Sequence, residues 1–284
     1  MAKLTRREFF KNLTAGGILA TFDPALIYQD KPRSENQKPS FGFYFGLASY
    51  TLRAFPLEEA ALMTRRLGLE RIVLKDVHLP LNSSAAEITA AADVVRAAGL
   101  DLYGCGVVYM NNEAELEQAF SYAQTAEMRM IIACPEPGLL PLIELKVKET
   151  SLALAIHNHG PGDKFYPTPD AAYEKVKNLD KRIGLCLDIG HAVRSGIDPA
   201  KAAAKFSERL LDVHIKDVSS PSKEGQTVEI GRGVIDIPAF LRTLIRLKYT
   251  GTLAFEYEKD EKDPLPGLAE SVGYVRGTLA ALKS

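Results

Sequence analysis

The histidines of this chain all lie where short apolar segments end, and two acidic residues lie at equivalent places. The five histidines are His78, His157, His159, His191 and His214. Asp188 directly follows the apolar run Ile183–Leu187, and Glu256 directly follows Leu253-Ala254-Phe255. A carboxylate beside buried apolar residues is costly unless it is paired or metal-bound. The pattern therefore indicates a metal site, and the alternative is a hydrogen-bonded structural network.

The alternation of side chains along a strand assigns these residues to common faces. His157 and His159 share a face with Ala155, Asp188 shares one with Cys186, and His214 shares one with Lys216. We therefore predict that four side chains meet and bind one divalent metal: His157, Asp188, His214 and Glu256. Two imidazoles with two carboxylates suit Mn²⁺, Zn²⁺ or Co²⁺ rather than a soft, thiolate-selected ion.

The elements that must position these residues follow a regular alternation from residue 41 onward. Short apolar runs predict eight strands: Phe43–Ser49, Arg71–Lys75, Asp101–Val108, Met130–Cys134, Leu152–Ile156, Ile183–Leu187, Leu211–Ile215 and Thr252–Phe255. Between them, helical periodicity predicts Leu57–Leu67, Ala85–Ala98, Glu113–Ala126, Leu139–Lys148, Pro169–Asn178, Pro199–Phe206, Pro238–Lys248 and Leu265–Leu282.

Eight strand and helix units in series favour an α/β fold with parallel strands, and a closed barrel is the simplest such fold. An open doubly wound sheet would need a glycine-rich phosphate turn after its first strand, and Gly46-Leu47-Ala48-Ser49 is no such turn. We predict a single (β/α)8 TIM barrel over residues 41–284. Active sites of such barrels lie at the C-terminal ends of the strands, where the histidines gather.

The N-terminal segment is typical of an export signal. Thr5–Lys11, with the sequence TRREFFK, resembles the twin-arginine motif, and Leu13–Phe22 is an apolar stretch too short to span a bilayer. We expect residues 1–27 to be the signal segment, residues 28–40 a linker, and the protein to be exported to the periplasm. The alternative is a basic amphipathic arm.

The net charge and the cysteines bear on what the protein binds and on its redox state. A formal net charge of −1 offers no basic surface for nucleic acid, so a small-molecule sugar is the expected partner. Cys105, Cys134 and Cys186 lie in apolar runs and are expected to be reduced core residues. No stable membrane span is expected, and the sequence leaves a homo-oligomer open.

The last four predicted strands resemble a known family. The motifs are Cys186–His191, Asp212–Asp217, Gly231–Asp236 and Thr252–Glu256, and together they are similar to the xylose isomerase-like barrel superfamily of sugar isomerases and epimerases. The resemblance implies that the acid after the sixth strand, the histidine in the seventh and the glutamate after the eighth bind a divalent metal. These are Asp188, His214 and Glu256.

The chain departs from this family after the fifth strand. Family members commonly have a glutamate ligand there, whereas this chain has His157-Asn158-His159. We interpret His157 as the substituted ligand and His159 as reaching the substrate. The substitution weakens a mechanism with two opposed glutamates. Glu136 could supply the missing carboxylate, although its flanking prolines are equally typical of a rigid loop.

The resemblance and the metal site together predict a metal-dependent sugar isomerase or epimerase that removes a proton beside a metal-bound carbonyl. The predicted catalytic residues are His159, Lys216 and Glu136, and the predicted substrate-binding residues are Lys75, His78, His191 and Arg232. One alternative is a lyase or hydratase acting on a 3-keto-sugar or glycoside. A second is a non-catalytic sugar-binding barrel. The DNA endonucleases of the superfamily need a basic groove, which the charge balance opposes.

Overall fold

The structure is a computed structural model that describes residue 39 and residues 41–283. The predicted signal segment, residues 1–27, and nearly all of the predicted linker lie outside these residues. Within the described part of the chain, no helix combines the length and the apolar character needed to cross a membrane.

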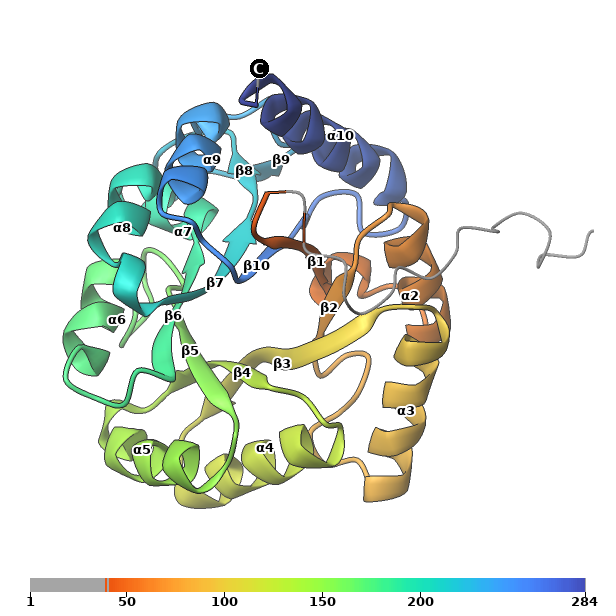
Figure 1. Cartoon of the computed structure of the whole chain (residues 1–284), viewed down its shortest axis with the longest axis vertical. Coiled ribbons are helices and arrows are strands. Elements are labelled where there is room, and N and C mark those ends of the chain that lie inside the picture. The colour runs from red at the N-terminus through yellow and green to blue at the C-terminus, as the bar shows by residue number, and fades with distance from the viewer. Residues whose placement is uncertain (1–38, 40, 284) are drawn as a thin grey trace, which may run out of the picture. The chain divides into compact units, whose positions relative to one another are not determined.

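Eight parallel strands close into a barrel (Figure 1). Their order around the barrel is β1-β10-β7-β6-β5-β4-β3-β2. Each barrel strand is therefore hydrogen-bonded to the barrel strands before and after it in the sequence, and β1 closes the barrel against β10. The bounds are β1 (Tyr44–Ala48), β2 (Arg71–Leu74), β3 (Asp101–Met110), β4 (Met130–Pro135), β5 (Ala153–His157), β6 (Ile183–Asp188), β7 (Leu210–Ile215) and β10 (Thr252–Phe255). The predicted fold class, a single (β/α)8 barrel, is confirmed.

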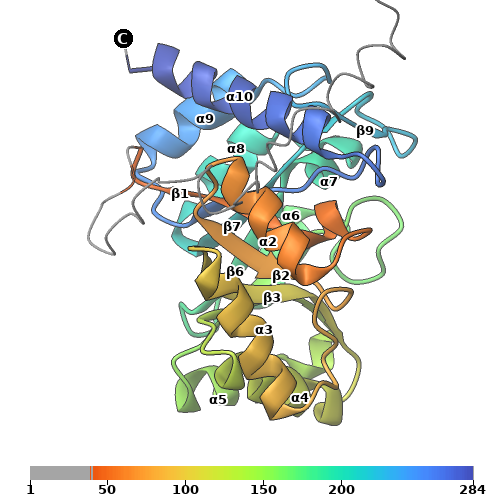
Figure 2. The same cartoon turned by 90° about the vertical axis from the view of Figure 1, so that its right-hand side faces the viewer.

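Helices form a ring around the strands, and the view turned by 90° shows α2, α3 and α4 along one side (Figures 1 and 2). The bounds are α2 (Leu57–Arg66), α3 (Ala85–Ala97), α4 (Glu113–Thr125), α5 (Leu140–Glu149), α6 (Pro169–Val176), α7 (Ile189–Arg194), α8 (Pro199–Lys205), α9 (Ile237–Arg246) and α10 (Leu265–Ala281). Short 3-10 turns add η2 (Ser49–Leu52), η3 (Pro137–Leu139) and η4 (Ser207–Arg209).

The sequence predicts where most helices begin because their N-caps have polar side chains. Ser84 and Glu87 form a reciprocal capping box at α3. Asn112 and Thr168 accept backbone hydrogen bonds at the starts of α4 and α6. These contacts satisfy N–H groups that the helix itself leaves without partners.

The strands supply the core because both their faces are covered. Every residue of β6 is buried, and so are all residues of β10. Cys105, Cys134 and Cys186 are buried and free, which confirms that the cysteines are core residues without disulfides. Burial leaves the strand ends at the mouth as the place where polar groups can meet a ligand.

Two short elements were not predicted, and both lie at the mouth. The helix α7 follows β6 without a loop, and a two-stranded antiparallel hairpin joins β8 (Asp217–Val218) to β9 (Thr227–Val228). Both are too short for a periodic pattern to reveal.

Asp217 fixes the loop that follows this hairpin. Its fully buried carboxylate accepts four backbone hydrogen bonds, from Val218 and Ile235 to Oδ1 and from Gly231 and Gly233 to Oδ2, at 2.9–3.2 Å. A Cβ on Gly233 would lie 2.2 Å from Oδ1, so this close approach requires glycine.

Replacing this carboxylate should destabilise the protein. We expect Asp217→Asn to lower the free energy of unfolding by about 2–3 kcal/mol, because the amide NH₂ would face two buried N–H donors that lose their acceptor. Urea denaturation followed by circular dichroism measures the change.

The matched control is Asp236→Asn, where the carboxylate only caps α9 through the backbone N–H of Ala239. Asparagine caps as well as aspartate, so this variant should stay within about 0.5 kcal/mol of the parent. Equal stability of Asp217→Asn and the parent would contradict the role assigned to Asp217.

Candidate metal centre

Four polar side chains converge at the C-terminal ends of adjacent strands. They are His157 at the end of β5, Asp188 at the end of β6, His214 in β7 and Glu256 directly after β10. These strands are consecutive in the barrel (Figure 1), and one ligand atom from each residue lies within 4.8 Å of every other. All four side chains are buried. The structure therefore assembles the predicted ligand set, which we call the four-residue cluster.

Local structure orients each carboxylate and imidazole. Asp188 caps α7, because its Oδ1 accepts the backbone N–H of His191 at 2.7 Å, and this contact turns Oδ2 toward the cluster. Oδ2 lies 3.5 Å from Nε2 of His157. Across the cluster, Nδ1 of His214 lies 3.3 Å from Oε2 of Glu256.

The chemistry of these atoms fits a divalent metal. Among the described residues, both ring nitrogens of His157, both ring nitrogens of His214 and Oδ2 of Asp188 are buried without a hydrogen-bond partner. Buried polar atoms are rarely left unpaired, and several that converge on one point are typical of an ion-binding site. Two imidazoles and two carboxylates form a donor set suited to Mn²⁺, Zn²⁺ or Co²⁺.

Lys216 supplies a countercharge inside the cluster. Its buried ammonium lies 3.0 Å from Oδ2 of Asp188, 2.6 Å from Oε2 of Glu256 and 2.5 Å from Oε1 of Glu258. Burial opposes ionisation of Asp188 and Glu256, yet this ammonium holds the pKa of each carboxyl well below its usual range. Three carboxylates against one ammonium leave two excess negative charges, which one divalent cation would balance.

Burial also decides the charge state of two imidazoles. Loss of water lowers the pKa of His157 to about 4 and that of His191 to about 3, so both rings are neutral near pH 7. Burial opposes protonation of His214 as well, but the adjacent Glu256 carboxylate outweighs it and raises the pKa of His214. Neutral His157 can therefore serve as a ligand without first losing a proton.

Two residues that we did not predict as part of the site contact members of the cluster. Asp212 is fully buried, with Oδ2 3.8 Å from Nε2 of His214, and it accepts a hydrogen bond from the Tyr103 hydroxyl at 3.2 Å. Burial raises its pKa to about 7. Asn158 joins the ends of β5 and β6 through hydrogen bonds with the Asp188 backbone at 2.9 and 3.0 Å. The alternation Asp212-Val213-His214 already places Asp212 on the face of His214 and could have identified it.

His159 lies beside the cluster rather than in it. Its ring is 5.0 Å from that of His157 and 5.3 Å from that of His191, and its side chain is 30% exposed, which leaves it open to a ligand. The Tyr109 hydroxyl lies 2.8 Å from Nδ1, and an Asp163 carboxylate oxygen lies 3.8 Å from the same atom. We did not predict Tyr109 or Asp163.

The remaining predicted site residues divide into two groups. His191 packs against both neighbouring histidines, and Lys75 lies 5.8 Å from the Tyr109 ring with its ammonium bonded to the Val107 carbonyl, so both lie at the mouth. His78 instead has both ring nitrogens occupied, by the Ser49 hydroxyl and the Leu52 carbonyl.

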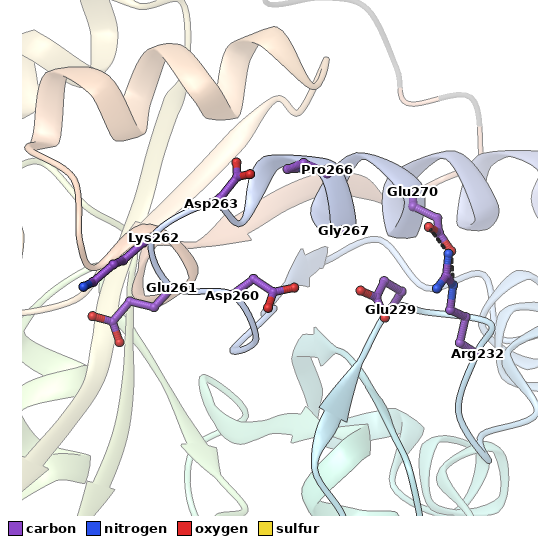
Figure 3. A pocket seen from close by; sticks show the side chains of 9 residues that line it. All are labelled: Glu229, Arg232, Asp260, Glu261, Lys262, Asp263, Pro266, Gly267 and Glu270. Carbon is purple, nitrogen blue, oxygen red and sulfur yellow. Dashed lines mark hydrogen bonds and ion pairs between the residues drawn. The ribbon is translucent and has the colours of Figure 1, made fainter.

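Arg232 and Glu136 lie outside the four-residue cluster. Arg232 pairs with Glu270 on α10 at 2.5 and 2.7 Å and lines a separate cavity of about 790 Å³ (Figure 3). Glu136 is exposed directly before η3 and belongs to none of the possible metal-binding groups among the described residues. The contacts of Arg232 and His78 come from residues far away in the sequence or from backbone atoms, which residue spacing cannot reveal.

Two curated proteins show partial similarity to this chain. The Rhizopine catabolism protein MocC of Rhizobium meliloti is 28% identical over 145 residues, which cover 45% of this chain and 44% of that protein. Inosose dehydratase of Geobacillus kaustophilus (strain HTA426) is 28% identical over 109 residues, which cover 33% and 34%. The match thus spans less than half the length of either relative.

Similarity in fold extends over most of the chain. The structure of L-ribulose 3-epimerase superposes with a TM-score of 0.69 and 16% identity, covering 85% of this chain and 96% of that one. The sequence matches the family described as Xylose isomerase-like TIM barrel over residues 57–278. This match covers most of the barrel and all four members of the cluster, so the chain belongs to the Xylose isomerase-like TIM barrel family.

Proposed function

We propose that this protein is a divalent-metal-dependent isomerase or epimerase that moves a proton at the carbon beside the carbonyl of a sugar or keto-sugar. The observation that supports this most directly is the convergence at the barrel mouth of the buried ring nitrogens of His157 and His214, which have no hydrogen-bond partner, with the buried carboxylates of Asp188 and Glu256. Family membership and the similarity to L-ribulose 3-epimerase agree with this chemistry.

The four-residue cluster would hold the metal. A divalent cation bound there would polarise a carbonyl oxygen and acidify the neighbouring C–H bond. Asp188 and Glu256 are ionised and His157 is neutral, so these three ligands need not lose a proton before binding near pH 7.

His159 is the side chain best placed to accept the proton. It is accessible and adjacent to the cluster, and its imidazole can accept a proton from a bound substrate. The Tyr109 hydroxyl orients the ring through Nδ1, and the carboxylate of Asp163 would stabilise the imidazolium that forms.

Lys216 serves better as a fixed positive charge than as an acid. Burial disfavours its ammonium, but the three surrounding carboxylates outweigh this effect and raise its pKa well above the usual value. An ammonium whose pKa is raised this far is a poor proton donor. We therefore assign Lys216 the role of holding Asp188 and Glu256 in place and offsetting negative charge that develops on the substrate.

A lyase or hydratase is the second candidate. The histidine at the position where family members commonly have a glutamate removes one of two opposed carboxylates, and the partial similarity to inosose dehydratase points the same way. Elimination needs a single base, because the proton that the base takes from carbon can pass to the hydroxyl, which then leaves as water. Export through a twin-arginine signal, which we also propose, would bring the enzyme to sugars and glycosides outside the cytoplasm.

Removal of the ligands should abolish metal binding. We expect about one Mn, Zn or Co per chain in protein purified without chelator, and little in the Asp188→Ala/His214→Ala double variant, because two of four ligands are lost. Metal mass spectrometry measures the content, and added metal should raise the melting temperature of the parent alone.

Asp198→Asn is a suitable control, since this exposed carboxylate lies outside the four-residue cluster, where it caps α8 and pairs with the exposed Lys201 at 3.6 Å. It should keep the full metal content. A well-folded, metal-supplemented parent without bound metal would leave the cluster as a hydrogen-bonded network and refute the proposed mechanism.

Loss of the proposed base should slow proton exchange without releasing the metal. We expect the metal-loaded parent to exchange a carbon-bound proton of a keto-sugar with solvent deuterium, and His159→Gln to slow this exchange at least about a hundredfold. Nuclear magnetic resonance of the sugar follows the exchange, and metal content should be unchanged because His159 lies outside the four-residue cluster.

The products separate the two candidate reactions. Isomerisation or epimerisation conserves the mass of the sugar apart from deuterium, whereas a hydratase run in reverse releases water. Exchange at the parental rate in His159→Gln would show that another group is the base.

A further inference from the structure

A second feature of the mouth is a polar cavity next to the four-residue cluster. It has a volume of about 460 Å³, and His191 and Lys216 form its inner wall. The β8–β9 hairpin, with Thr227 and Val228, and the segment after β10, with Glu258 and Lys259, enclose it from the other sides. The cavity therefore adjoins the cluster through His191 and Lys216, which contact cluster members.

Most charged groups in the wall are already neutralised by partners. Lys216 forms ion pairs with Asp188, Glu256 and Glu258. Glu258 is the only carboxylate among the residues that line the cavity, and Lys216 neutralises it. Lys259 pairs with the buried Glu229 at 2.7 Å. Neither lysine thus has an uncompensated charge to offer.

Arg194 differs from both lysines. Its guanidinium donates to two neutral acceptors, Nδ1 of His191 at 3.3 Å and the Lys223 carbonyl at 2.8 Å, while its Nε is buried without a hydrogen-bond partner. Within the described chain it forms no salt bridge with a carboxylate. Glu224 is near enough for Arg194 to help lower its pKa, but that carboxylate is bound by the Ser222 hydroxyl at 2.9 Å.

The arginine is also held in place before any ligand arrives. It extends from α7, its two hydrogen bonds fix both ends of the guanidinium, and its Cγ packs over Gly225, where a Cβ would approach to 3.3 Å. A rigid guanidinium with free N–H groups suits the planar, paired oxygens of an acid, and little entropy is lost on binding.

We propose that this cavity is a subsite for the acidic group of a sugar, with Arg194 as the residue that recognises the carboxylate or phosphate oxygens. The inference rests on the proposed function, because it takes the cluster to hold the reacting end of the same sugar. The protein is then selective for acidic sugars over neutral ones.

The larger cavity of Figure 3 has the opposite character. Carboxylates dominate its wall, among them Glu229, Asp260 and Asp263, and its arginine, Arg232, is neutralised by Glu270. An acidic sugar would be repelled there, which leaves the cavity beside the cluster as the better site for it.

Isothermal titration calorimetry tests this selectivity on the full-length protein, both metal-loaded and metal-free. The probes are D-glucuronate, D-glucose 6-phosphate and D-glucose. We expect at least one acidic sugar to bind the parent about tenfold or more tightly than glucose, and Arg194→Gln to lose this preference while keeping its affinity for glucose. Arg194→Lys should retain part of the preference, since lysine keeps the positive charge but lacks the planar, paired N–H donors of the guanidinium.

Lys201→Gln is the control, because this lysine is 86% exposed and lies on α8 outside the cavity. It should bind all three sugars like the parent. An acidic sugar that binds the metal directly would keep its advantage in Arg194→Gln, and that result overturns the proposal. Equal affinity of the parent for acidic and neutral sugars also overturns it, while metal binding and proton exchange would still support the proposed function. Failure of all three sugars to bind the metal-loaded parent counts against both.

Discussion

The burial of like charges at the barrel mouth is the constraint on which the rest of this structure depends. Asp188 and Glu256 are both buried and ionised beside two imidazoles, and isolated buried carboxylates would cost several kcal/mol each. Lys216 offsets part of that cost. Its stem passes so close to α7 that a Cβ on Gly190 would lie 2.4 Å from its Cγ, so the glycine is needed for the ammonium to reach the cluster. A divalent cation would neutralise the charge that remains.

The neighbouring elements keep this arrangement rigid. Asn158 joins the end of β5 to the end of β6 through hydrogen bonds to the Asp188 backbone. The carboxylate oxygen of Asp188 that does not face the cluster caps the N-terminus of α7. On the other side, Asp217 follows Lys216 directly and gathers four backbone donors from the hairpin and the loop beyond it. Each support lies within two residues of a cluster member or of Lys216 in the sequence. The strand ends and the loops are thereby fixed together, as a preorganised site requires.

The sequence predicted the strands well because a parallel barrel buries both faces of each strand, which produces continuous apolar runs. It also predicted the cluster, since strand ends in such a barrel must meet at one mouth. It did not reveal α7 or the β8–β9 hairpin, whose two to six residues are too few to show a period. Nor could it reveal that Glu270 neutralises Arg232 from α10, or that Ser49 and the Leu52 carbonyl occupy His78, because such contacts depend on the folded chain. Tyr109 was missed for the same reason, although it directly follows the predicted strand Asp101–Val108.

The two sides of the mouth differ in a way that would orient a substrate. On the side of β3 and β5, Tyr109 and His159 offer a stacked ring pair joined by a hydrogen bond. The charged groups on this side are the Asp163 carboxylate and the Lys75 ammonium, and Lys75 is paired with Asp76. On the side of α7, the cavity is lined by Arg194, whose guanidinium forms no salt bridge with any described carboxylate. The cluster lies between these sides. A sugar with one acidic end would therefore place that end toward Arg194 and its carbonyl near the cluster, which turns the neighbouring C–H bond toward His159. Fixed charge on one side and an ionisable base on the other would give a single binding direction, and the same proton would then be presented in each turnover.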